Sequence, residues 1–117
     1  MTVDDFAVQV ETTASRFRFI QAVVRLDKTR FSVKYRLIIA ADLYVQVYAN
    51  VRNHTIGLAL ICQGRRLYGR DCEDGRWHRH PADAPDTHDF SVEGALPTTI
   101  EDFLLESGQT LVAQGLI

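Results

Sequence analysis

The feature that most constrains the fold is a run from Phe31 to Val51 in which apolar and polar residues alternate. A short break at residues 40–42 divides this run into two halves. Because successive side chains of a strand point to opposite faces, a period of two predicts half-buried antiparallel strands at 31–39 and 43–51. One face of the resulting sheet is apolar, so other parts of the chain have to cover it.

Three further strands are expected beside this pair. Residues 16–26 are apolar on both faces, which is typical of a strand covered at least partly on both sides. Residues 56–62 and 66–70 also have strand character, and short polar turns separate them. Short connections favour hairpins over parallel crossovers, so the five strands are predicted to form an antiparallel β-meander.

The segment before the first strand is predicted to be a helix. Thr2 and Asp5 have the spacing of a capping box, and acidic residues suit the positive end of a helix. Phe6 and Val10 form an i, i+4 apolar pair, although the alternation of apolar residues here also fits a strand. We therefore expect an N-terminal helix that packs on the sheet.

The segment after Pro97 is predicted to be a second helix. Thr98 and Glu101 offer another capping box, and apolar residues recur behind it at helical spacing. Gly108 is expected to interrupt or end this helix. The sequence thus predicts a single α+β domain over residues 1–117, a five-stranded antiparallel β-meander with an N-terminal and a C-terminal helix packed on one face.

Length and composition agree with one globular domain. The chain has 117 residues, of which 46% are hydrophobic and 24% charged, which is enough to form a core without a disulfide framework. Cys62 and Cys72 are interpreted as free thiols. The longest nearly uncharged runs, 37–41 and 56–63, are too short to cross a bilayer, so no membrane partner is predicted. The acidic N-terminus is unlike a secretory signal, and a cytoplasmic location is expected.

Charge is divided unevenly along the chain. Residues 1–70 contain eleven basic and five acidic side chains, whereas residues 71–117 contain two basic and ten acidic ones. This division permits an anionic ligand on the sheet half, and it equally permits the C-terminal part to neutralise the sheet on which it packs. We favour the second explanation.

Candidate functional residues concentrate between Arg70 and Asp89. This stretch contains three of the four histidines, at positions 78, 80 and 88, and Trp77. Regular periodicity is lost from residue 71 to residue 97, a region that contains all three prolines. A long loop is expected there, with a short strand at 88–92, and long loops in compact domains are often functional.

Two kinds of chemistry fit this stretch. If residues 77–80 are extended, His78 and His80 project from the same face and could share one metal ion. The further ligand would then come from His88, Asp71, Asp86 or Asp89. Alternatively, a phosphodiester can be cleaved with one histidine as base and another as acid, while arginines stabilise the charge on phosphate.

The second chemistry would use other parts of the sheet to hold a polyanion. Candidate basic guides are Lys34, Arg36, Arg65 and Arg66, and candidate stacking residues are Tyr44, Tyr48 and Trp77. The many acidic residues of the loop would repel nucleic acid unless they are paired or bind a cation. A purely structural explanation also remains, in which the histidines lie on the surface of an amphipathic loop and the arginines pair locally.

Residues 42–106 contain, in this order, an alternating strand, a glycine-turn hairpin, a histidine- and proline-containing loop and a capped helix, with the sequences DLYVQVYANV, GRRLYGRD, WHRHPADAPDTHDF and PTTIEDFLLE. In the order and type of these elements the chain resembles the TumE-like family of toxin–antitoxin proteins. This resemblance implies a small α+β fold and the toxin component of a two-gene module, for which an RNA-directed activity is supposed.

The resemblance to this family also extends to individual residues. Arg70 and Asp71 stand where the family has a basic or aromatic residue followed by Asp, and residues 78–81 correspond to its His/Pro loop. Two departures are present: Cys72 stands where Asn is expected, and one close histidine pair with a separate His88 replaces a fuller set of paired histidines.

The leading hypothesis is therefore a toxin that acts on RNA with ribonuclease-like chemistry and that pairs with an antitoxin protein. His78, His80 and His88 are assigned acid/base or ligand roles, with Asp71 orienting one of them, and Arg70 and Arg79 are assigned to phosphate. This hypothesis assigns no metal and no cofactor. The alternative from another class is a non-catalytic protein-interaction module, compatible with a homodimer, whose basic sheet face binds an acidic protein segment.

Overall fold

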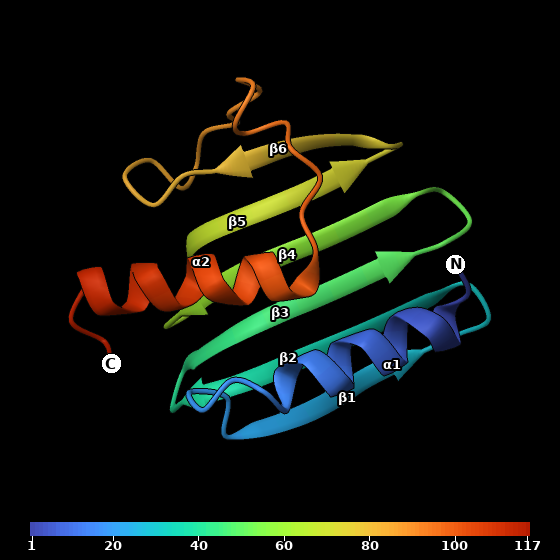
Figure 1. The fold of residues 1–117 in the computed structure, drawn as a ribbon, viewed down its shortest axis with the longest axis horizontal. Helices are drawn as coiled ribbons and strands as arrows, with labels where there is room; N and C mark the ends of the chain where they lie inside the picture. The colour runs from blue at the N-terminus through green and yellow to red at the C-terminus, as the bar shows by residue number, and fades with distance from the viewer.

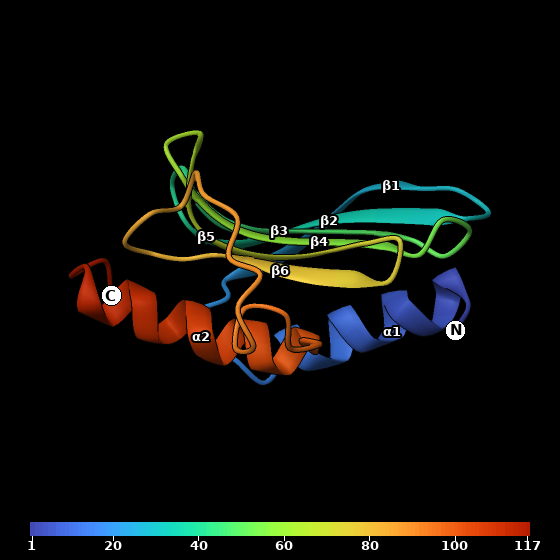
Figure 2. The same cartoon turned by 90° about the horizontal axis from the view of Figure 1, so that it is seen from above.

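The computed structural model describes residues 1–117 as one antiparallel sheet and two helices. The six strands lie in the sheet in the order in which they occur in the chain (Figure 1). Viewed from above, the sheet forms one layer and both helices lie on the same side of it (Figure 2). The elements are α1 (Val3–Ala14), β1 (Ala22–Lys28), β2 (Ser32–Ala40), β3 (Leu43–Asn50), β4 (Thr55–Cys62), β5 (Arg65–Glu73), β6 (Arg76–His80) and α2 (Ile100–Ala113).

The predicted α+β meander with terminal helices on one face is confirmed, but the sheet has six strands and not five. The additional strand, β6, lies in the segment that was expected to be a loop. It forms a hairpin with β5 across Asp74 and Gly75, whose φ angles of 51° and 79° are both positive. Positive φ at both central residues is typical of the type I′ turns that fit the twist of a two-residue hairpin.

Both helices begin at capping boxes. In α1, the Asp5 amide donates to the Thr2 hydroxyl and the Thr2 amide donates to the Asp5 carboxylate, as predicted. The cap of α2 lies one residue later than predicted, because Thr99 pairs with Asp102. Each box satisfies amides that have no partner inside the helix, which fixes where the helix starts.

Gly108 does not end α2, and the helix continues through it to Ala113. A Cβ atom at this position would lie 3.1 Å from the ring of Phe19. The glycine therefore allows the turn before β1 to pack closely against the helix.

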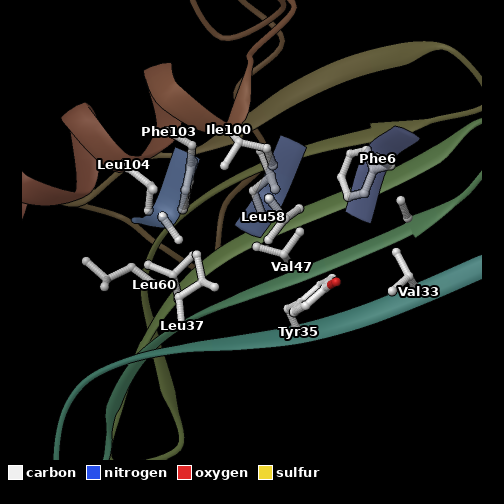
Figure 3. Close-up of a cluster of buried hydrophobic side chains, with 14 of the residues drawn as sticks. Phe6, Val33, Tyr35, Leu37, Val47, Leu58, Leu60, Ile100, Phe103 and Leu104 are labelled. Carbon is white, nitrogen blue, oxygen red and sulfur yellow. The ribbon is translucent and has the colours of Figure 1, made fainter. Parts of the chain in front are cut away.

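The core lies between the helices and one face of the sheet (Figure 3). Alternate residues of β2 and β3 are buried on this face, and the intervening residues are only half-buried. Phe6 from α1 and Phe103 and Leu104 from α2 pack over them. The alternation therefore separates a helix-covered face from an opposite face, which we call the open face.

The first strand differs from the prediction. β1 begins only at Ala22, lies at one edge of the sheet, and has only exposed residues. The expected apolar residues Phe17, Phe19 and Ile20 instead lie in turns and pack partly against the core. Neither helix of the protein combines the length and the apolar character needed to cross a membrane.

Candidate functional site

The β5–β6 hairpin sorts the candidate residues onto two faces of the sheet. Asp71 lies opposite His78, and Gly69 lies opposite His80. These pairs face the open side, since their neighbours Arg70 and Cys72 continue the buried, helix-covered rungs of the sheet. The prediction that His78 and His80 share a face of an extended segment is thus confirmed, and Asp71 joins them across the strand pair.

Three polar atoms converge at this point. His78 Nε2 and His80 Nε2 lie 3.2 Å apart. Asp71 Oδ2 lies 3.2 Å from His80 Nε2 and 3.5 Å from His78 Nε2. The three atoms form a nearly equilateral triangle, and we call Asp71, His78, His80 and the adjacent His88 the histidine cluster.

The third histidine reaches the cluster through a single bridge. Arg79 and Asp89 exchange two backbone hydrogen bonds of 3.0 and 2.8 Å, so the returning chain lies beside β6. His88 then falls on the open face, and its ring centroid lies 4.9 Å from that of His78 and 4.8 Å from that of His80. The short strand expected at 88–92 is reduced to this one bridge.

Side chains reinforce the bridge from the helix-covered side. Arg79 donates to Asp89 Oδ2 through Nε at 2.9 Å and Nη2 at 2.6 Å. Hydrogen bonds from Ser91, and then from Arg79, lower the pKa of Asp89 to about 2. A Cβ atom at Gly94 would overlap the Asp89 carbonyl oxygen, so this tight return of the chain requires glycine there.

The contact with Pro85 fixes the orientation of the His80 ring. The Pro85 carbonyl oxygen lies 3.0 Å from His80 Nδ1 and can only accept, so Nδ1 carries a hydrogen and the lone pair of the neutral ring is on Nε2. Burial, and then the nearby Arg66 guanidinium, lower the pKa of His80 from its usual value. Nε2 is directed into the cluster.

Arg66 lies across the ring of His80. Its Nη1 is 3.0 Å from Nδ1 and 3.2 Å from Nε2. An atom this close to both nitrogens lies over the ring, because in the ring plane it would overlap Cε1. Gly69 leaves space for this side chain, since a Cβ there would lie 3.4 Å from Arg66 Cδ and Nε. The sequence had indicated Arg66 only as a guide on the sheet surface.

The cluster is covered although it lies on the open face. His78 and His80 are only 4% and 3% exposed. The ring of Phe90 lies 5.1 Å from that of His78, and the Arg76 guanidinium lies 4.4 Å from the centre of the Phe90 ring. His88 remains exposed at the rim, so solvent reaches the cluster from that side.

A row of basic and aromatic side chains leads across the open face to the cluster. One rung of the sheet joins Lys34, Tyr48, Gly57, Asp71 and His78 as successive cross-strand partners. With strands about 4.8 Å apart, its length is about 19 Å.

A second rung runs from Arg36 towards His80. The Arg36 guanidinium lies 4.5 Å from the centre of the Tyr44 ring. The Nε atoms of Arg36 and Arg66 are buried and lack a hydrogen-bond partner. We call Lys34, Arg36, Tyr44, Tyr48 and Arg66 the open-face row.

The structure does not bring Arg70 to the cluster. Its side chain lies on the helix-covered face, where Nε and Nη2 donate to the two carboxylate oxygens of Glu106 at 3.1 and 3.0 Å. Nη1 donates to the carbonyl oxygens of Glu93 and Gly94. The hydroxyl of Tyr68 also donates to Glu106, at 2.7 Å. Arg70 is thus fully engaged within the protein.

Other candidates are also placed away from the open face. Arg79 is paired with Asp89 on the helix-covered side, and Trp77 packs partly against the core there. Arg65 is an exposed residue at the start of β5, opposite Cys62. Of the residues assigned to phosphate from the sequence, neither Arg70 nor Arg79 lies on the open face, and Arg66 is the arginine that contacts the cluster.

Clefts lie elsewhere on the molecule. One of about 560 Å³ is lined by both helices, and one of about 420 Å³ lies near Met1, Phe6 and Trp77. Neither is lined by a residue of the histidine cluster.

Comparisons of the chain with protein-family models, with curated proteins and with solved structures find no match.

Proposed function

We propose that this protein is the toxin of a toxin–antitoxin pair and cleaves single-stranded RNA at the histidine cluster. The observation that carries the proposal is that the cluster and the open-face row share one face of the sheet. A single strand laid along this row would place its phosphates near basic side chains and its bases near tyrosine rings, which is how sheets commonly hold single-stranded RNA. The resemblance to the TumE-like family supports the same substrate.

The local charges suit an RNA backbone. Asp89 is neutralised by Arg79, and Asp71 lies among the histidines and 4.0 Å from Arg66 Nη2. The guanidinium groups of Arg36 and Arg66, both on half-buried side chains of the open face, are forked donors that suit phosphate. At the end of the row, the cluster would supply the groups that activate a nucleophile and stabilise the leaving oxygen.

The proposal is tested by inducing the wild-type chain and the variant His78→Ala/His80→Ala in a bacterial host, matched for folded protein, and by incubating both purified proteins with labelled single-stranded RNA. We expect growth arrest and cleavage with the wild type only, with a rate loss of at least about 100-fold in the variant. Equal cleavage by both proteins, or none by either, would overturn the proposal.

The open-face row is tested separately. Lys34→Gln/Arg36→Gln should weaken RNA binding about tenfold and reduce the slope of log affinity against log salt by about 1.4, since each lost phosphate contact contributes about 0.7 for a single strand. Arg65→Gln, a basic residue outside the row, is the matched control and should behave as wild type. Binding of an acidic protein segment that needs Lys34 and Arg36 but not the histidines would instead identify a non-catalytic interaction module.

A further inference from the structure

The histidine cluster brings three possible ligand atoms to one point. Asp71 Oδ2, a carboxylate oxygen that can only accept, lies 3.2 Å from His80 Nε2 and 3.5 Å from His78 Nε2. The two Nε2 atoms lie 3.2 Å from each other. Arg66 lies over the His80 ring and leaves the in-plane lone pair free. A positive centre between the three atoms would satisfy all of them.

The size of the triangle indicates what that centre is. Nitrogen and oxygen ligands lie about 2.0–2.1 Å from a tetrahedral zinc ion, so neighbouring ligand atoms are separated by about 3.3–3.4 Å. The separations of 3.2, 3.2 and 3.5 Å among Asp71 Oδ2, His78 Nε2 and His80 Nε2 agree with this value. The three side chains are held at ligand spacing by the β5–β6 pairing.

The surroundings are those of a metal ligand shell. A metal-binding histidine commonly donates its other ring hydrogen to a carbonyl oxygen, as His80 does to Pro85. The three ring nitrogens of His78, His80 and His88 lie within 4.8 Å of one another. The exposed His88 thus stands beside the fourth position, where a water molecule or a substrate oxygen can also enter from solvent.

We infer that Asp71, His78 and His80 form a binding site for one divalent transition-metal ion of the zinc type, with His88 next to its open position. The inference rests on the proposed function for its chemistry and deepens it. A bound ion would lower the pKa of a water molecule at its open position. His88 would accept the proton of that water as the water oxygen bonds to phosphorus, and it would return a proton to the leaving sugar oxygen as the bond from phosphorus to that oxygen breaks.

The positive charge of Arg66 should weaken the binding of a metal ion at this site. Its guanidinium lies 4.0 Å from Asp71 Oδ2, so a dication at the cluster would have a fixed positive neighbour. Arg66→Gln removes this repulsion but keeps all ligands, and it should bind metal more tightly while cleaving RNA more slowly. If Arg66→Gln tightens metal binding and slows RNA cleavage, Arg66 binds phosphate and is not a metal ligand.

The test uses the full chain purified without a histidine tag and stripped of metal. Titration with Co²⁺ should give the intense visible absorption of tetrahedral nitrogen and oxygen coordination at one ion per chain, and Zn²⁺ should displace it. Asp71→Asn and His80→Gln should weaken Co²⁺ binding at least about tenfold, and His88→Ala should have a smaller effect. His54→Asn, outside the cluster, should bind as wild type.

The Co²⁺ spectrum of the wild-type protein tests the inference by itself, so the test does not depend on whether the variants fold. Absence of stoichiometric Co²⁺ absorption in the wild type would overturn it, as would equal affinity in folded His80→Gln. RNA cleavage that survives metal removal would also overturn it and leave the proposed function standing. Stoichiometric binding without any cleavage would support the metal site and reject the proposed function.

Discussion

Arg70 and Asp71 are neighbours in β5, yet they belong to two opposite kinds of polar site. On the helix-covered face, Arg70, Tyr68 and Glu106 satisfy one another through three hydrogen bonds, and Arg70 donates a further one to the Glu93 carbonyl oxygen. On the open face, Asp71 Oδ2 and the Nε2 atoms of His78 and His80 lie within 3.5 Å of one another. The first arrangement is complete within the protein, whereas by our inference the second is completed by a metal ion. Burial alone does not separate them, because both contain side chains that are nearly inaccessible.

The largest expected effect on stability concerns the helix-covered face. Glu106→Gln removes the charge that compensates Arg70, whose side chain is 6% exposed. Leaving a buried charge unpaired should lower the free energy of unfolding by about 3 kcal/mol, measured by urea denaturation. The double variant Arg70→Met/Glu106→Leu should recover most of this loss. A decrease below about 1 kcal/mol in Glu106→Gln would show that the pair contributes little.

A pH effect of intermediate size is expected from the same network. Burial, and then the hydrogen bond to Glu106, raise the pKa of Tyr68 to about 12 from its usual value of 10.0. The folded state therefore holds this proton more tightly than the unfolded state, and the stabilisation is complete below pH 10 and is lost as the pH rises towards 12.

Absorbance of tyrosinate during alkaline titration, compared between wild type and Tyr68→Phe, measures this pKa. The difference between the two titrations should have its midpoint near pH 12 while the protein is folded. A midpoint near 10 would mean that Tyr68 is not held by the network.

The smallest effect on stability should come from the open face. In metal-free protein, His78→Leu removes a ring nitrogen from the incomplete cluster and keeps an apolar contact with Phe90. Because removing mismatched polar groups from a buried site costs little, the free energy of unfolding should change by less than about 1 kcal/mol. Added Zn²⁺ should raise the Tm of the wild type and not that of this variant. A loss above about 2 kcal/mol without metal would show that the cluster is a structural element like the Arg70 network.

Much of the fold could be predicted because the signals were local. The period of two in β2 and β3, the Thr2 capping box and the short turns each act within a few residues, and the structure confirms them. β6 was missed because RWHRH has no β-branched residue and its buried side chains are histidines. The Asp74-Gly75 pair before it was the available signal, since this dipeptide favours two-residue hairpins.

The candidate site could be predicted only in part, for a different physical reason. Alternation along a strand places His78 with His80, and this much follows from sequence. The face on which Arg70 lies depends on its pairing with Leu58 in β4. The position of His88 depends on the bridge between Arg79 and Asp89, which are ten residues apart in the chain. Such long-range pairings, like the stacking of Arg66 on His80, leave no periodic trace in the sequence.

The simple strand order has a consequence for how the protein folds. Every strand pairs with the next one along the chain, so each hairpin closes a short loop at low entropic cost and the sheet can grow by local steps. The histidine cluster lies wholly on residues 71–88, whereas α2 (Ile100–Ala113) follows them in the chain and packs across the sheet. We therefore expect the β5–β6 hairpin to form early in folding and the docking of α2 to be the late step. Variants of the helix interface would then speed unfolding more than they slow folding.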